Sequence, residues 1–209
     1  MRLVNEFQRI LLEVPQTIID IGDEHVLNDK LGNIKLARKI QANSKKKVVK
    51  ELEAAVTLYE LPEKYVVLDE TNPAVPRVIY FVWYKIQNLN FINRKAASQI
   101  LVWRAGGYPI LTGLAEYVFN ELILPITGTI VTDYQQTNNG KRFWQDRIGK
   151  ALKAKKYVYY VNFQPERVIK QINHISDLED LDKQAYGVHQ KFRQRRLIIA
   201  EDPIVLTNS

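Results

Sequence analysis

The chain of 209 residues contains no cysteine. This absence excludes a disulfide framework, a metal site built on thiolates, and a cysteine nucleophile. Long apolar runs are also missing, because no stretch reaches the roughly 18 consecutive apolar residues typical of a membrane-spanning helix. The first fourteen residues are amphipathic and include Glu6 and Glu13, so they do not resemble a signal peptide. We therefore expect a cytoplasmic protein with no membrane partner.

Histidine is scarce as well. The three histidines, His25, His174 and His189, are far apart and do not have the spacing of a metal-ligating motif, so no metal is expected. No Gly-x-Ser-x-Gly sequence is present, which argues against a serine nucleophile elbow. The carboxylates of residues 177–182 alternate around a short predicted helix, and a solvated face explains them better than an acid–base pair.

What the chain does have is positive charge, with a formal net charge of +7 and a pI near 9.4. A basic balance favours polyanionic partners such as nucleic acid, although it also serves solubility. Lys45, Lys46 and Lys47 are placed by the pattern in the first turn of a predicted helix, where the helix dipole disfavours cations. They are therefore candidate nucleic-acid contacts, with a solvated helix end as the alternative. Two further clusters lie at residues 141–156 and at 193–196.

The N-terminal part, residues 1–60, is expected to be mostly helical. Apolar residues at helical spacing predict a helix up to Pro15, and a second helix is predicted over Asn43–Leu61. Residues 64–70 and 77–86 are rich in β-branched and aromatic residues and predict a strand hairpin. Residues 91–103 fit either a helix or a strand.

The second half predicts alternating helices and strands. A helix over residues 110–124 ends at Pro125, and a strand over Thr129–Asp133 leads through a polar turn into a helix over Arg142–Ala154. With a strand over Tyr157–Phe163, these elements predict a βαβ unit with two paired parallel strands. Residues 165–172 and 176–183 predict short helices, and residues 195–200 a late strand. The fold class is α/β: one domain over 1–209, with a mixed β-sheet flanked by helices after the helical N-terminal part.

The turn before the helix at Arg142 combines Asn138, Asn139, Gly140 and Lys141. Glycine lets the backbone approach a ligand closely, and the unpaired N–H groups of a helix N-terminus bind anions. The alternative is a plain helix cap with a glycine that suits the turn. The spacing is not that of a P-loop or of a dinucleotide fingerprint.

The order strand, glycine-containing turn, helix, strand over about Thr127–Phe163 resembles the GNAT-type N-acyltransferases. That family has a mixed sheet, and its signature loop, Gln/Arg-x-x-Gly-x-Gly/Ala, holds the pyrophosphate of acyl-coenzyme A. The stretch also resembles divergent members found in phage and mobile-element proteins. Laid on this chain, the resemblance implies a cofactor site formed by Tyr134, Thr137, Asn138, Asn139, Gly140, Lys141 and Arg142, in which only Gly140 matches the pattern well.

The family commonly uses a tyrosine just after the strand that follows the signature helix to protonate the departing thiolate. No tyrosine occupies that place, so the resemblance offers Tyr160 and Asn162 as neighbouring candidates. Asp133 is the candidate base, with a turn carboxylate as the alternative.

Two functions are consistent with these residues. One is an acyl-coenzyme A-dependent N-acyltransferase that acts on an amine. The other is a non-catalytic protein of the same fold that binds nucleic acid or a host protein through its basic surfaces. Elsewhere, Arg104 before the glycine pair Gly106 and Gly107 fits a cleft-lining loop, although a plain loop explains it too.

Overall fold

The computed structural model describes residues 24–89, 92–132, 138–162, 168–178 and 195–204. Contacts divide the chain into two compact units, one of residues 1–83 and 101–110 and one of residues 84–100 and 111–209. Within the described residues, nine strands join in one mixed sheet of order β1-β2-β3-β4-β5-β6-β9-β7-β8. The expected α/β class with a mixed sheet and flanking helices is confirmed, whereas the expectation of a single domain stays a prediction.

The first unit begins with the helices α3 (Glu24–Asn28) and α4 (Lys30–Gln41). Four strands follow, each antiparallel to the next: β1 (Lys47–Glu53), β2 (Val56–Leu61), β3 (Lys64–Asp69) and β4 (Arg77–Leu89). The part of β4 after Trp83 belongs to the second unit. The predicted hairpin of β3 and β4 is confirmed. The helix predicted over Asn43–Leu61 is wrong, because these residues form the hairpin of β1 and β2. Two-residue turns favour positive φ, which Ala55 adopts with φ of 62°.

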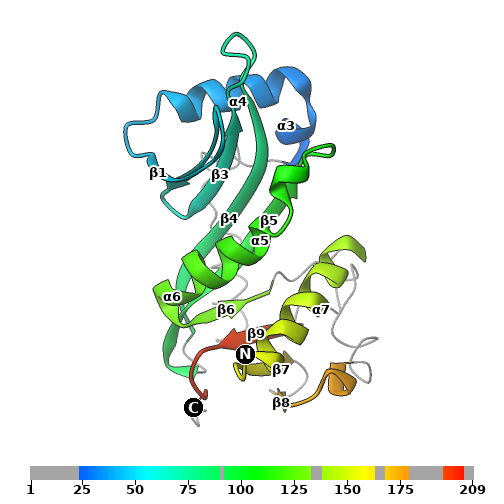
Figure 1. Cartoon of the computed structure of the whole chain (residues 1–209). Coiled ribbons are helices and arrows are strands. Elements are labelled where there is room, and N and C mark those ends of the chain that lie inside the picture. Colours follow the sequence, from blue (N-terminus) through cyan, green and yellow to red (C-terminus); the bar gives the residue numbers. More distant parts are fainter. Residues whose placement is uncertain (1–23, 90–91, 133–137, 163–167, 179–194, 205–209) are drawn as a thin grey trace. The chain divides into compact units, whose positions relative to one another are not determined.

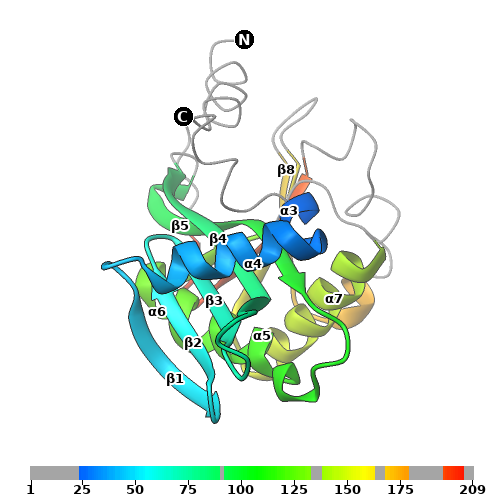
Figure 2. The same ribbon diagram turned by 90° about the horizontal axis from the view of Figure 1, so that it is seen from above.

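Helix α4 covers one face of these strands. In Figure 2 it lies across β2, β3 and β4. The apolar side chains of its inner face, Leu36, Ala37 and Ile40, belong to one buried cluster with residues from all three strands, namely Tyr59, Leu61, Val66, Leu68, Val78 and Phe81. Burial of large apolar side chains contributes about 1.5–3 kcal/mol each, so this cluster stabilises the packing of α4 on the strands.

A buried asparagine fastens α4 to the sheet. The side-chain amide of Asn33 donates to the carbonyl oxygens of Leu27 (2.9 Å) and Val78 (3.0 Å), and its oxygen accepts from the N–H of Val78 at 2.8 Å. The Asn33 side chain therefore bonds both the backbone N–H and the backbone carbonyl of Val78, as a residue of a neighbouring strand would.

We expect Asn33→Ala to lower the free energy of unfolding by about 2–3 kcal/mol, because the substitution leaves one buried donor and two buried acceptors without partners. Urea unfolding measures the loss. The matched control is Asn28→Ala, since Asn28 is exposed and accepts one bond, from the indole of Trp103. Equal losses in the two variants would contradict the role given to Asn33.

A crossover joins two parallel strands, and its first part, residues 101–110, belongs to the first unit. Strand β5 (Arg94–Arg104) pairs in parallel with β6 (Thr129–Val131) at two positions, Ala97 with Ile130 and Ser98 with Val131. The ambiguous residues 91–103 are thus mostly a strand. A helical segment joins β5 to β6: the 3-10 turn η2 (Pro109–Leu111), α5 (Leu114–Tyr117), the π-helix η3 (Val118–Ile123) and α6 (Leu124–Thr127).

Pro125 does not end this segment, contrary to the sequence prediction. Proline lacks an N–H and its ring clashes with the carbonyl four residues earlier, so a regular α-helix cannot continue through it. The wider turns of η3 come before it, and Pro125 then lies in the first turn of α6, where no donor is required. The helix ends at Gly128, whose φ of 64° allows its N–H to donate to Leu124 at 2.7 Å.

The remaining elements of the second unit are α7 (Asn138–Lys153), β7 (Tyr157–Asn162), β8 (Val168–Ile172) and β9 (Arg195–Ala200). The strand predicted over residues 195–200 is confirmed. Residues 168–172 form a strand, so the short helix predicted there is wrong. Strand β9 lies between β6 and β7 and is antiparallel to both. The predicted βαβ unit is therefore corrected: β6 and β7 point the same way but are not paired.

Candidate functional site

The loop after β5 is held at both ends. The N–H of Ala105 donates to Ile79 at 2.9 Å, and the guanidinium of Arg104 donates to the carbonyl of Tyr108 at 3.1 Å. The hydroxyl of Tyr108 donates to the carboxylate of Asp69 at 3.2 Å. Burial raises the pKa of the Tyr108 hydroxyl, and the negative charge of Asp69 raises it further, so Tyr108 stays protonated as a donor. These contacts fix the loop on β3 and β4.

Between these anchors, the backbone of Gly106 and Gly107 is open. A Cβ added at either glycine would meet no atom within 4 Å. Gly107 has a φ of 81°, a backbone conformation that residues with side chains rarely adopt. Within the described residues, no partner is found for the two N–H groups. Arg104 is exposed and belongs to the same loop, and the exposed Arg77 contacts Tyr108 of that loop. Two N–H groups without partners in a loop that carries a cationic side chain are suited to bind an anion such as a phosphate.

The turn favoured by the sequence has a different local structure from the one expected. Helix α7 begins at Asn138 instead of Arg142, so Asn138, Asn139 and Gly140 form its first turn. Lys141 and Arg142 follow in the second turn, with Arg142 exposed. Asp133, Tyr134 and Thr137 lie outside the described residues. The assignment of this segment to a cofactor stays a prediction.

Tyr160 and Asn162 lie on β7. They are two residues apart, so they share one face of the strand. Tyr160 is buried, and burial raises the pKa of its hydroxyl while the positive charge of Arg195 partly offsets the rise. Asn162 is half-buried and lies opposite Arg195 in the pairing with β9. Their catalytic role stays a prediction.

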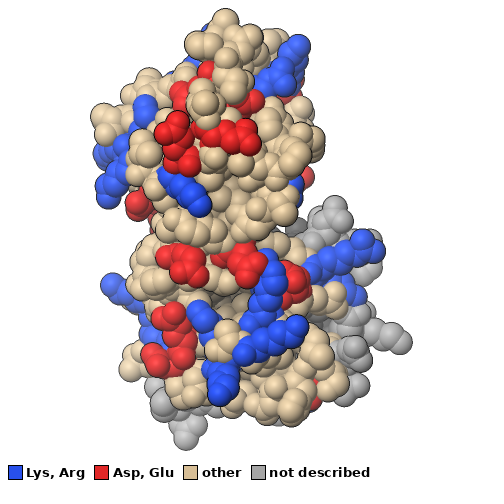
Figure 3. Space-filling model, viewed as in Figure 1, with Lys and Arg blue, Asp and Glu red and all other residues tan. Residues whose placement is uncertain are grey.

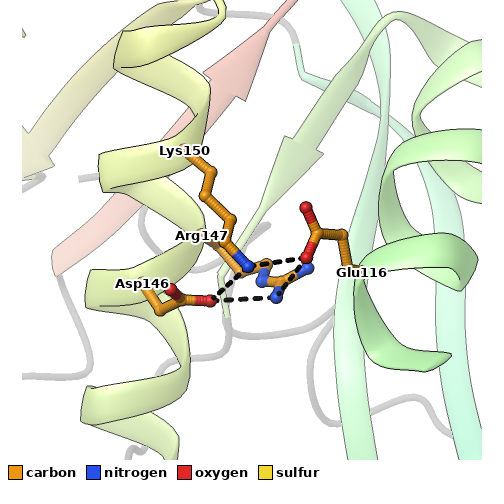
Figure 4. A network of polar contacts seen from close by, with 4 residues as sticks. All are labelled: Glu116, Asp146, Arg147 and Lys150. Atoms are coloured by element: carbon orange, nitrogen blue, oxygen red, sulfur yellow. Dashed lines mark hydrogen bonds and ion pairs between the residues drawn. The ribbon is translucent and has the colours of Figure 1, made fainter. Parts of the chain in front are cut away.

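A network of four charged groups, which the sequence did not indicate, links α7 to α5. Figure 4 shows Arg147 between the carboxylates of Glu116 (3.4 Å) and Asp146 (2.9 Å), and Lys150 lies 2.6 Å from Glu116 and 3.3 Å from Asp146. The hydrogen bond from Lys150 lowers the pKa of Glu116. Burial raises the pKa of Asp146, but bonds from Arg147 and Lys150 outweigh it and lower the value. Because the charges balance, the network is best explained as a helix–helix link.

The basic clusters carry less available charge than the sequence suggests. Lys46 donates to the carbonyl of Gln41 and lies over the ring of Tyr59, 5.8 Å from its centroid, whereas Lys45 and Lys47 are exposed. The three lysines do not open a helix, because they lie in the loop after α4 and at the start of β1. In the cluster at 141–156, Arg147, Lys150 and Lys156 each face a carboxylate. Figure 3 shows acidic groups among the basic ones on the face in view.

Among the residues that the structure describes, no group of three or more histidine or acidic side chains is placed to hold a metal ion. Among the described residues, one helical segment, Pro109–Thr127, is long and apolar enough to cross a membrane, as core helices of soluble proteins also can be. In the comparisons with known proteins, no family model, no curated protein and no solved structure matches this chain.

Proposed function

We propose that the protein is a GNAT-like N-acyltransferase that transfers an acyl group from acyl-coenzyme A to an amine. The observation that carries the proposal is the parallel pair of β5 and β6, with a glycine loop and a helical crossover between the two strands. In the GNAT-type family, the strand before the signature loop and the strand after the signature helix are neighbours. In this chain that relation holds for β5 and β6, and not for β6 and β7.

The signature is therefore better laid on the loop after β5. The family pattern Gln/Arg-x-x-Gly-x-Gly/Ala then covers Arg104 to Pro109, with Arg104 in its first position and Gly107 in its fourth. Pro109 departs from the last position. The open N–H groups of Gly106 and Gly107 are the groups that would hold the pyrophosphate. Arg104 would both shape the loop and attract the anion.

This alignment also changes the catalytic candidates. The strand that follows the crossover helix is now β6, and Asp133 and Tyr134 come directly after Thr132 in the sequence. In this alignment, Tyr134 stands at the sequence position of the family's general acid. With the signature laid on Thr137–Arg142, no tyrosine stands at that position. Acyl-coenzyme A would supply the thioester whose C–S bond breaks as the amine nitrogen bonds to the acyl carbon. From their position in the sequence, Asp133 would accept the proton of the amine, and the Tyr134 hydroxyl would protonate the thiolate that leaves.

Calorimetric titration with acetyl-coenzyme A tests the cofactor site. Gly106 does not have positive φ and its Cβ position is empty, so Gly106→Val should fold normally. We expect it to weaken acetyl-coenzyme A binding by more than about tenfold, because the branched side chain would cover the N–H groups that the phosphates need.

Gly140→Val provides the matched comparison, since it makes the same change in the first turn of α7. Loss of binding in Gly140→Val alone would return the site to Thr137–Arg142. If the wild-type protein shows neither heat nor a thermal shift at millimolar acetyl-coenzyme A, the acyltransferase proposal is wrong, and the non-catalytic alternative is favoured.

A further inference from the structure

The outer face of α4 is mostly basic. Of the five exposed residues in this helix, four are cationic, namely Lys30, Lys35, Arg38 and Lys39, and the fifth is Leu31. Helix α4 contains no acidic residue. Lys35, Arg38 and Lys39 are spaced i, i+3 and i+4, so they share one side of the helix. The chain continues from this face to the exposed Lys45 and Lys47.

Two carboxylates close to α4, those of Asp29 and Glu70, accept hydrogen bonds from other groups of the protein. Asp29 caps α4 and accepts from the N–H of Gly32 at 2.6 Å. Glu70 accepts from the amide of Gln41 at 2.7 Å and from the hydroxyl of Tyr59 at 3.0 Å. The guanidinium of Arg38 donates to the carbonyl of Ala74 at 2.9 Å, which holds it without neutralising its charge. Asp29 and Glu70 keep their negative charges in these bonds, but the four cations of α4 outnumber them, so the face presents a net positive charge.

We propose that this face of α4 binds the phosphate backbone of double-stranded nucleic acid, independently of acyl transfer. Its cations extend from Lys30 to Lys39, nine steps along the helix or roughly 13 Å, which fits a row of phosphates instead of a single one. The apolar side of α4 is buried in the core, so it is not available for insertion into a membrane.

The same surface argues for a duplex over a single strand. Single-strand binding combines cations with exposed aromatic rings on which bases stack. Neither α4 nor the segment of residues 42–50 contains an aromatic residue. Contacts would be limited to the phosphate backbone, so we expect binding with little sequence preference and a strong dependence on salt.

The experiment measures fluorescence anisotropy of a labelled 20-base-pair DNA duplex of mixed sequence against salt concentration. The test variant replaces Lys35, Arg38 and Lys39 by glutamine. We expect at least about a tenfold weaker affinity at low salt, and a fall of about 2.7 in the slope of log K against log salt for three lost phosphate contacts. The matched control replaces Lys95, Lys153 and Lys170 by glutamine, which removes the same charge from exposed positions of the second unit.

The control variant should keep the wild-type slope. Equal losses of affinity in both triple variants would show that only the net charge matters, and would overturn the assignment to α4. A wild-type protein that does not bind the duplex at low salt would overturn it too. Competition by phosphatidylserine vesicles at equal charge, or tighter binding of a 20-nucleotide single strand, would overturn the choice of partner. Acetyl-coenzyme A titration of the test variant should match the wild type, which keeps this inference separate from the acyltransferase proposal.

Discussion

Replacing Trp144 by alanine should lower the free energy of unfolding by about 3–5 kcal/mol, as expected for the loss of a fully buried large aromatic side chain. Trp144 is 1% exposed and lies on the inner face of α7. Its ring makes edge-on contacts with Phe143, at 5.3 Å between centroids, and with Phe119 of η3, at 5.6 Å. Truncation would therefore remove the packing that holds α7 against the crossover helix. Denaturant unfolding followed by circular dichroism measures the loss.

Trp144→Phe separates packing from polarity. The indole N–H of Trp144 is buried and has no hydrogen-bond partner among the described residues. Phenylalanine keeps an aromatic ring and removes this unsatisfied donor, so we expect a loss of only about 1 kcal/mol. If Trp144→Phe destabilises as much as Trp144→Ala, then the indole N–H makes a stabilising bond, and the account of this cluster as plain aromatic packing is wrong.

Local sequence pattern was a poor guide where two patterns compete. Residues 43–61 place Val48, Leu52, Val56 and Tyr59 at helical spacing, yet they form a hairpin. The β-branched residues of the segment, Val48, Val49, Val56 and Thr57, lie in the two strands, and the turn at Ala54 and Ala55 lacks the glycine or asparagine that usually marks positive φ. Val48 is 68% exposed on β1, so helical spacing of this residue with Leu52, Val56 and Tyr59 does not reflect a shared buried face.

Strand order depends on contacts that are distant in sequence. The strands themselves were predicted over 64–70, 77–86 and 195–200, because alternation and β-branched content are local properties. The insertion of β9 between β6 and β7 joins residues more than thirty positions apart, as in the pairing of Tyr160 with Leu197. Short connections favour direct pairing of consecutive parallel strands, and that preference led to the wrong βαβ unit.

The proposed cofactor loop differs from the one expected from the sequence, because the choice depends on which strands are paired. The sequence predicts a helix after Gly140 and another after the pair Gly106–Gly107, but in the structure Gly140 lies inside α7. The pairing of β5 with β6 favours the glycine pair as the anion loop. A signal was present before the structure: Arg104 and Gly107 match two positions of the family pattern, and Pro109 suits the first turn of a helix. The network of Glu116 and Arg147 had no local signal, because its members are 31 residues apart.

If Tyr134 is the general acid, Tyr134→Phe should lower kcat by about 10²–10⁴-fold while the acetyl-coenzyme A affinity stays unchanged, because only proton delivery to the thiolate is lost. Release of coenzyme A thiol can be followed with a thiol-reactive dye, which the protein itself does not consume because it has no cysteine. Acceptors to test are a polyamine and lysine-containing peptides, since both present primary amines.

Tyr160→Phe is the matched control, since it removes the same hydroxyl from a buried position on β7. We expect it to keep most of the turnover. A large loss in Tyr160→Phe with an active Tyr134→Phe would move the acid to β7 and support the original choice of Tyr160 and Asn162. Binding of acetyl-coenzyme A without turnover of any acceptor would leave the cofactor loop in place and favour a protein that retains the cofactor site but has lost acyl transfer.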